Sequence, residues 1–299
     1  MHKILLPFLC CAALSLGAAE KKIVFVAGRA SHGPGSHEHR AGCLLFQKCL
    51  EQFGGITSVV YSNGWPAQAD AFQGADAVVI FSDGGGGHPA LQNNGLATLR
   101  ELMKKGVGLG LLHYAVEIPK DNGGPELLAW AGGYFETYYS VNPFWTPEFA
   151  PLPRHPITRG VKPFTMRDEW YYHMRFPEGM KNVTPILSAV PPDETRGKPG
   201  ANDAHRGNPE VQKHQGETEH VMWAIERPDG GRGFGFTGGH NHVGWADENM
   251  RKVVLNAIVW IAKVEVPENG VAISLKPEDF EVNLDLKGPK PKTEKKAKR

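Results

Sequence analysis

The chain has 299 residues, enough for one large α/β domain or two smaller ones. Hydrophobic residues make up 41% and charged residues 22%, so the composition excludes wholesale disorder and a membrane protein with several spans. The formal net charge of +1 hides an asymmetry, because residues 287–299 carry a net +6 and residues 20–286 carry 25 Lys or Arg against 31 Asp or Glu, a net −6. Since this positive charge is not laid along a folded face, no nucleic-acid partner is expected.

The first 19 residues have the pattern of a secretory signal peptide. A short basic start ending at Lys3 precedes an apolar run over 4–16 that is too short to span a bilayer, and the small residues 17–19 follow. The alternative, a first core strand or helix, would place an unbroken apolar stretch directly before the next strand. We therefore expect cleavage before Glu20, export to the periplasm or the extracellular space, and no transmembrane segment afterwards.

Short continuous apolar runs predict four buried strands in the first half, with helices between them. The predicted strands are 23–26, 57–61, 77–81 and 107–112, and the helical spacing covers 43–53 and 91–103. Strands without polar alternation, separated by helices, form a parallel sheet that is covered on both faces. The predicted fold is therefore α/β, a doubly wound, mostly parallel, flavodoxin-like sheet. Cys43 and Cys49, six residues apart on one helix, are expected to be buried thiols and not a disulfide.

The second half is less regular. It contains a short predicted helix at 126–131, two late strands at 221–225 and 233–236, and a closing helix at 249–262. Between the halves, residues 191–219 contain only three apolar residues, which is too few to offset the entropy of ordering. This segment is expected to be mobile or to act as a lid over the strand ends.

Histidines follow four of the predicted strands at the point where each strand ends. The loops concerned are 29–40, 82–88, 113–117 and 237–242. Ligands bind outside the carboxyl ends of the strands in an open parallel sheet, so these loops predict a shared site at one edge. Any single histidine can instead be a satisfied structural group. The glycines at 84–87 favour a close backbone approach, because neither a G-x-G-x-x-G motif nor a P-loop lysine is present, and no nucleotide cofactor is expected.

Binding of a divalent metal such as Zn²⁺ at this edge is a more specific hypothesis than nucleotide binding. The candidate ligands are Glu169 and the imidazoles of His39, His113, His240 and His242. Three such ligands and one open position suit a catalytic zinc site, although no compact H-E-x-x-H or C-x-x-C spacing is present. The alternative for Glu169 is a salt bridge with Arg167 or Arg175.

Further residues of these loops are candidates for binding a small carbohydrate. The polar candidates are Arg29, His32, His37, Asp83 and Tyr114. Aromatic rings that could stack on a sugar are Trp145, Trp170, Tyr171, Tyr172 and Trp245. For most of these rings, packing in the core is the competing interpretation.

Five ordered motifs resemble a ThuA-like (trehalose utilisation) domain over residues 22–265. They are GVGLGLLH (106–113), HPIT (155–158), DEWY (168–171), GGH (238–240) and NAIVW (256–260). The resemblance implies a class I glutamine amidotransferase-like fold and a role in disaccharide catabolism, including oxidised (3-keto) sugars, with metal binding in some members. The amidotransferase G-x-C-x-G turn reads Gly-Leu-Leu-His-Tyr at 110–114, without a cysteine, so glutaminase chemistry is excluded.

These observations predict a signal peptide (1–19), a ThuA-like α/β domain (20–270) and a C-terminal extension with a basic disordered tail (271–299). The expected function is a metal-assisted enzyme acting on a glycoside or keto-sugar, with His113, His240 and Glu169 as its catalytic residues. The alternatives are a non-catalytic carbohydrate-binding protein of the cell envelope and a scaffold domain of an envelope assembly.

Overall fold

The computed structural model describes residues 20–288, so the expected signal peptide and the tail from residue 289 lie outside the described residues. A seven-stranded sheet forms its centre. In sheet order the strands are β2 (Ile56–Tyr61), β1 (Lys21–Ala27), β3 (Ala77–Phe81), β4 (Gly108–Leu112), β11 (Arg232–Phe236), β10 (Glu219–Glu226) and β9 (Val183–Ala189). The first five are parallel, and β10 runs antiparallel to both of its neighbours.

The mostly parallel sheet confirms the predicted fold class. The four early strands and the two late strands lie where their apolar runs placed them, whereas β9 was not predicted. Its sequence, VTPILSA, contains Thr184, Pro185 and Ser188 and lies at the sheet edge, where one side of the strand has no neighbour within residues 20–288. A polar edge strand lacks the continuous apolar run that marks the central strands.

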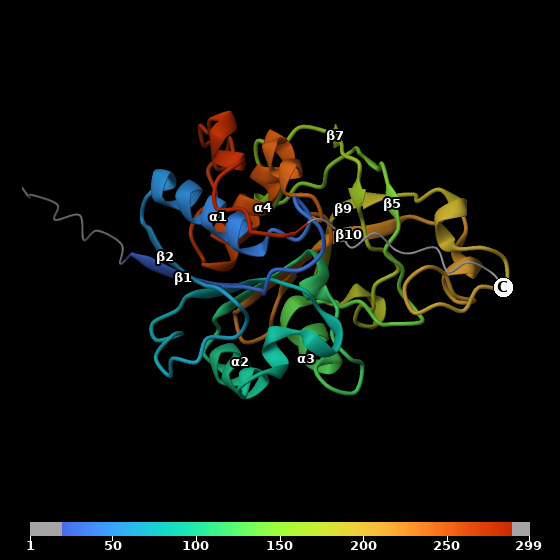
Figure 1. Cartoon of the computed structure of the whole chain (residues 1–299), viewed down its shortest axis with the longest axis horizontal. Helices are drawn as coiled ribbons and strands as arrows, with labels where there is room; N and C mark the ends of the chain where they lie inside the picture. The colour runs from blue at the N-terminus through green and yellow to red at the C-terminus, as the bar shows by residue number, and fades with distance from the viewer. Residues whose placement is uncertain (1–19, 289–299) are drawn as a thin grey trace, which may run out of the picture.

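Helices cover both faces of the sheet (Figure 1). Helices α1 (His39–Phe53) and α4 (Glu248–Ile261) lie on one face, and α2 (Gly95–Lys104) and α3 (Gly124–Ala131) lie on the other. Alternate residues of each strand enter separate cores, so that Phe25 packs on the α1 and α4 side and Val24 on the opposite side. Cys43 and Cys49 are buried free thiols of α1, as predicted.

Two small ribbons and several short 3-10 segments complete the fold. Strand β5 (Phe144–Trp145) pairs with β8 (Asp168–Glu169), and β6 (Glu148–Phe149) pairs with β7 (Phe164–Thr165). The 3-10 segments of the described residues are η1 (Gly85–Gly87), η2 (Pro89–Leu91), η3 (His113–Val116), η4 (Pro156–Thr158), η5 (Glu178–Met180), η6 (Asp193–Arg196), η7 (Val211–His214), η8 (His242–Ala246) and η9 (Pro277–Phe280). No helix within residues 20–288 has the length and apolar character needed to cross a bilayer.

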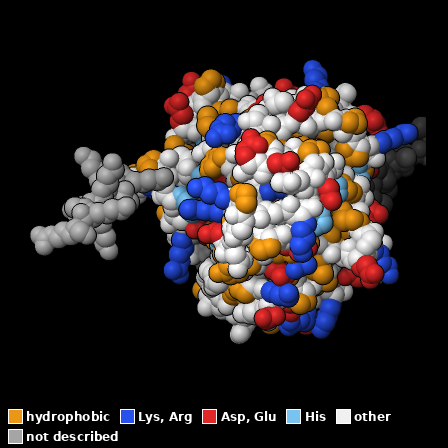
Figure 2. Space-filling view, turned by 90° about the vertical axis from the view of Figure 1, so that its right-hand side faces the viewer, with side chains coloured by type: hydrophobic (Ala, Val, Ile, Leu, Met, Phe, Trp, Pro, Cys, Tyr) orange, Lys and Arg blue, Asp and Glu red, His pale blue; other side chains and the backbone are white. Residues whose placement is uncertain are grey.

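Residues 191–219 are anchored mainly by polar contacts. The fully buried Arg196 donates through Nη1 to Glu219 Oε1 at 3.1 Å, and the buried Asn208 donates to the carbonyl of Tyr139 at 3.0 Å. The expectation that this segment is mobile or acts as a lid considered only apolar burial. These polar contacts add to that account, and the mobility of the segment stays a prediction. Figure 2 shows the face at the right of Figure 1, where this segment lies, and acidic and basic side chains are interspersed there.

The C-terminal segment 271–288 packs against α4, α1 and the residue that precedes α1. Val271 is buried, and Lys48 of α1 pairs with Asp279 at 2.5 Å. Lys287 Nζ lies 3.1 Å from Glu38 Oε1, and both side chains are at least 95% buried. This part of the predicted extension is therefore joined to the domain.

Gly238 gives a direct test of packing near the sheet edge. A Cβ added there would lie 2.5 Å from Cζ3 of the buried Trp170 ring. Gly238→Ala should therefore lower the free energy of unfolding by about 1–3 kcal/mol through overpacking. Urea unfolding measures this loss. Gly86→Ala is the control, since nothing lies within 4 Å of its added Cβ, and equal stability of the two variants would contradict the packing argument.

Candidate functional site

Four adjacent parallel strands end at the same edge, and each delivers one polar side chain to it. His37 follows β1, Asp83 follows β3, His113 follows β4 and His240 follows β11. Glu169 reaches the same place from β8. The predicted convergence of the loops is therefore present in the structure.

Four of these side chains form a compact set, in which one ligand atom of each lies within 4.8 Å of the others: His37, His113, Glu169 and His240. The Nε2 atoms of His37 and His113 are 3.1 Å apart, and His37 Nε2 is 3.0 Å from His240 Nδ1. Oε2 of Glu169 is 2.9 Å from His240 Nδ1 and 3.6 Å from His113 Nε2. Three imidazoles and one carboxylate thus surround a common point.

In two of the imidazoles, the nitrogen that points away from the common point donates a hydrogen bond. His113 Nδ1 donates to the carbonyl of Thr237 at 2.8 Å, and His37 Nδ1 donates to Asp83 Oδ1 at 2.6 Å. Burial lowers the pKa of His37 to about 4 and places the pKa of His113 well below its ordinary value. Both rings are therefore neutral at pH 7, and their Nε2 lone pairs face each other at 3.1 Å. A cation between them would remove this repulsion.

Asp83 and Tyr171 support the set from outside it. Burial acts to raise the pKa of Asp83, but hydrogen bonds from His37 and Ser31 and the neighbouring imidazoles together lower it to about 2. Asp83 is therefore ionised and fixes the proton on His37 Nδ1. Burial, reinforced by Glu169, raises the pKa of Tyr171, so its phenol stays protonated. The hydroxyl lies 3.3 Å from both Glu169 Oε2 and His113 Nε2 and can donate its one proton to either.

The backbone at the site is left-handed at three histidines. The φ angles are 59° at His32, 50° at His37 and 55° at His113. Residues other than glycine seldom adopt this region, although histidine does so more often than most. Such conformations cost about 1–3 kcal/mol each and cluster at functional sites. The rings of His37 and His113 lie in the ligand set, whereas the ring of His32 stacks on His37 outside it.

Comparisons with known proteins identify the family. The sequence profile described as ThuA, trehalose utilisation, matches residues 23–261. The chain belongs to the ThuA family. The crystal structure of a ThuA-like protein from Bacteroides uniformis ATCC 8492 is similar, with a TM-score of 0.59 and 16% identity over 82% of this chain and 92% of the other. The crystal structure of a ThuA-like protein from Parabacteroides merdae ATCC 43184 is also similar, with a TM-score of 0.55 and 15% identity over 83% of this chain and 92% of the other. A search of the curated proteins gives no match.

In this ThuA-family chain, the structure brings together His113, His240 and Glu169 as the sequence suggested. Glu169 makes no salt bridge with Arg167 or Arg175 among the described residues, and Arg175 pairs with Glu136 instead, at 2.9 Å. The fourth member of the set is His37, which the sequence placed among the substrate-binding residues.

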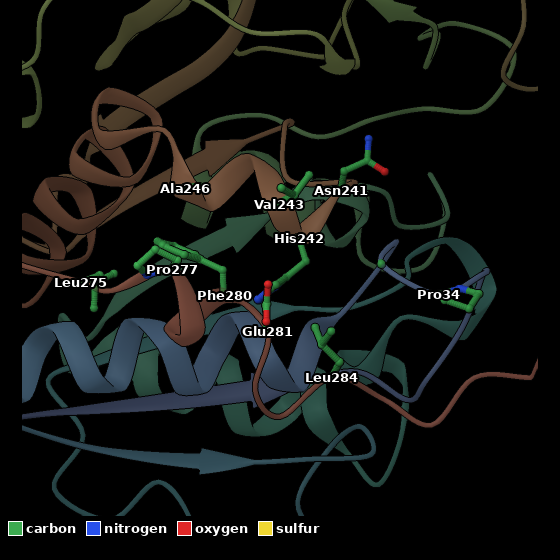
Figure 3. Close-up of a pocket in the computed structure, with 11 residues that line it drawn as sticks. Pro34, Asn241, His242, Val243, Ala246, Leu275, Pro277, Phe280, Glu281 and Leu284 are labelled. Carbon is green, nitrogen blue, oxygen red and sulfur yellow. The ribbon is translucent and has the colours of Figure 1, made fainter.

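His39 and His242 were proposed as ligands but lie outside the set. His39 is the first residue of α1 and directs Nδ1 to the carbonyl of Arg29 at 3.1 Å, with Nε2 3.6 Å from Asp83 Oδ1. His242 lines a separate, mostly apolar pocket of about 600 Å³ between η8 and η9 (Figure 3). Neighbouring histidines point in different directions here because a helix and a 3-10 segment begin between them.

The substrate-binding candidates divide into rim and core residues. His32 is exposed and stacks on His37 with ring centroids 3.6 Å apart, and Tyr114 lies 6.2 Å from the same ring. Arg29 is exposed and contacts the carbonyl of Asn63. The aromatic rings predicted as stacking platforms are buried in the core, which leaves no open face in this structure: Trp145, Trp170, Tyr171, Tyr172 and Trp245.

The glycines before His240 serve packing instead of ligand access. Cβ atoms added at Gly238 and Gly239 would collide with the rings of Trp170 and Trp245, at 2.5 and 2.6 Å. Gly84 does allow a close backbone approach, since its Cβ would lie 2.2 Å from the carbonyl oxygen of Tyr114. The loop after β3 therefore packs against the loop after β4, as the glycine run indicated.

The sequence interpretation missed a pocket beside Glu169 and His240. This cavity of about 310 Å³ is lined by Asn142, Phe144, Thr195, His205 and Arg206, among others. Phe144 is 41% exposed and its ring centroid lies 4.9 Å from that of His240. Phe144 lies beside Glu169 of the DEWY motif because β5 pairs with β8. The sequence gives no sign of this pairing, so it could not reveal the pocket.

Proposed function

We propose that the chain is an exported, metal-assisted enzyme that acts on a glycoside or an oxidised (keto) sugar. The observation that carries the proposal is the pair of neutral Nε2 atoms of His37 and His113, which face each other at 3.1 Å beside a carboxylate. Membership of the trehalose utilisation family supports a sugar substrate. The signal-peptide pattern of residues 1–19 supports a periplasmic or extracellular location.

The donor atoms fit a divalent cation such as Zn²⁺. The atoms that would hold it are His37 Nε2, His113 Nε2, His240 Nδ1 and Glu169 Oε2. Neutral imidazoles and a carboxylate are the ligands of catalytic zinc sites, and Asp83 supplies the outer carboxylate that commonly orients a ligating histidine. When bound, such an ion acts as a Lewis acid toward a carbonyl or hydroxyl oxygen.

Glu169 connects this set to the cavity beside it. Its Oε2 lies within the set, whereas Oε1 is 3.5 Å from Nδ2 of Asn142, which lines the cavity. Glu169 is therefore placed to accept a proton from a hydroxyl, or from a carbon next to a carbonyl, of a sugar bound there. The exposed face of Phe144 offers a surface for the apolar side of a sugar ring, and Asn142 and Arg206 offer hydrogen-bond donors.

A non-catalytic carbohydrate-binding protein is the second candidate. The exposed Phe144 ring beside polar side chains supports it, since sugar binding at such a surface needs no catalytic group. A binding protein has no need of three converging imidazoles, which favours the enzyme.

Turnover of defined sugars tests the proposal. The purified zinc-loaded chain is incubated with trehalose, other disaccharides and their 3-keto derivatives, and products are followed by NMR. We expect turnover that disappears on chelation and falls about 10²–10⁴-fold in Glu169→Gln, because the proton acceptor is lost. Glu148→Gln, which alters an exposed glutamate of β6, is the matched control. Binding heats without any product would support the second candidate instead.

A further inference from the structure

A second group of possible metal ligands lies away from the central site. His173, Glu210 and His214 each place one ligand atom within 4.8 Å of the others. Glu210 and His214 belong to the segment 191–219, at and beside η7, whereas His173 follows the buried Tyr171 and Tyr172. The group therefore joins a long surface segment to the body of the domain, on the right of Figure 1.

His173 presents one free nitrogen in this group. The residue is 7% exposed, and its Nδ1 donates to Glu219 Oε1 at 3.2 Å. The same carboxylate is held by Arg196 at 3.1 Å. His173 Nε2 is buried and has no hydrogen-bond partner among the described residues. Because an unpaired buried polar atom is costly, a partner from outside the described residues is expected at this nitrogen, and a cation is one that fits it.

His214 repeats this arrangement. Its Nδ1 donates to Glu217 Oε2 at 2.8 Å, and its Nε2 lies 3.9 Å from Glu210 Oε1. The other oxygen of Glu210 accepts from Lys213 Nζ at 2.7 Å, which leaves Oε1 available. Each imidazole thus has an outer carboxylate on Nδ1, the pattern that fixes the tautomer of zinc-binding histidines. The two rings are close, with centroids 4.6 Å apart.

We infer that His173, Glu210 and His214 bind a divalent cation of the Zn²⁺ type, at a site separate from the central one. Two histidines and one glutamate form a known zinc ligand set. Three atoms that are at most 4.8 Å apart lie at most about 2.8 Å from a common centre. Zn–N bonds are about 2.0–2.1 Å long. Each ligand atom therefore needs to move by less than about 1 Å to reach an ion at that centre.

The cation would fix the segment 191–219 close to the central cavity. The same segment carries His205, whose Nε2 lies 3.1 Å from Glu117 Oε2 and whose ring stacks on Phe135. His205 also lines the cavity beside Glu169. The second ion therefore has a structural role, in which it holds one wall of the proposed substrate pocket in place.

Counting zinc ions distinguishes the two sites. The purified full-length chain is stripped with a chelator and titrated with Zn²⁺ by calorimetry. We expect two ions per chain in the wild type, one in His214→Gln or Glu210→Gln, one in His240→Gln, and none in the His214→Gln, His240→Gln double variant. His220→Gln, which removes an imidazole on β10 outside both groups, should retain two. Glu217→Gln should weaken the second site about 10–100-fold.

Amide exchange adds a readout of position. In His240→Gln, which retains only the second site, zinc should slow exchange over residues 208–217 about tenfold or more and leave the core strands unchanged. Unchanged zinc stoichiometry and affinity in both His214→Gln and Glu210→Gln would overturn the inference. A single wild-type ion that is lost in His214→Gln but kept in His240→Gln would support this site while contradicting the central one.

Discussion

Replacing His37 by Asn should remove the cation from the central site and reduce turnover at least about 100-fold. His37 contributes one of the two facing Nε2 atoms, and loss of even an outer partner of a metal ligand costs about 10–100-fold in affinity or activity. Asn suits the test because it tolerates the positive φ of this position. Zinc calorimetry and the sugar assay measure the two effects.

The control for this variant is His88→Gln. His88 is equally buried, but it bonds only to Ala90 and Ala115 and lies outside every ligand group of the described residues. It should keep both ions. Asp83→Asn should give an intermediate result, with affinity about 10–100-fold weaker, because it alters only the partner of His37 Nδ1. Normal zinc binding at the central site of a folded His37→Asn variant would refute the ligand set.

Acidification should strongly destabilise the metal-free chain well above the pH at which carboxylates titrate. Burial lowers to about 4 the pKa values of His37, His39, His88 and His242. Each of these imidazoles binds a proton in the unfolded chain below about pH 6.5 but stays neutral in the folded chain until about pH 4. The free energy of unfolding should therefore fall by roughly 1.4 kcal/mol per pH unit for each of them between these values.

Two other groups set the limits of this effect. A hydrogen bond to Glu117 raises the pKa of His205, so that residue gains stability from protonation and offsets part of the loss. Asp83, with a pKa of about 2, loses its contribution only below about pH 4. Between about pH 6.5 and pH 5, four such imidazoles together lower the free energy of unfolding by roughly 8 kcal/mol. Typical domains are stable by about 5–15 kcal/mol, so most of this stability should be lost near pH 5.

Urea unfolding at pH 7.5, 6 and 5 measures the dependence, with the chelated protein. His88→Gln removes one of the four imidazoles. The slope of the free energy of unfolding against pH should therefore fall by roughly 1.4 kcal/mol per pH unit, while metal binding stays unchanged. Equal free energies of unfolding at pH 7.5 and pH 5 would show that these imidazoles take up protons in the folded state.

The fold was predictable because burial on both faces leaves a simple trace in the sequence. Strands such as 77–81 are continuous apolar runs, and they coincide with the strands of the structure. The edge strand β9 and the two-residue ribbons leave no such trace, because their residues are partly polar and their partners are distant. Local patterns specify the centre of the sheet better than its margins.

The site was predictable at the level of loops, but only partly at the level of atoms. Sheet topology places residues 37, 83, 113 and 240 at one edge, which is deducible from strand order. The choice between His37 and His39 depends on where α1 begins and on the φ of His37. The same applies to His240 and His242, because a 3-10 segment begins at His242. Such backbone details are fixed by tertiary contacts and are not encoded in spacing.

The strand order also determines when the central site can exist. His37, Asp83 and His113 are made early in synthesis, and their strands β1, β3 and β4 are neighbours that can pair as the chain emerges. His240 arrives more than 100 residues later, just after β11, which lies between β4 and β10. The ligand set is therefore completed only by closure of the sheet, so a bound ion would report a finished fold and an incomplete chain would be unable to retain it.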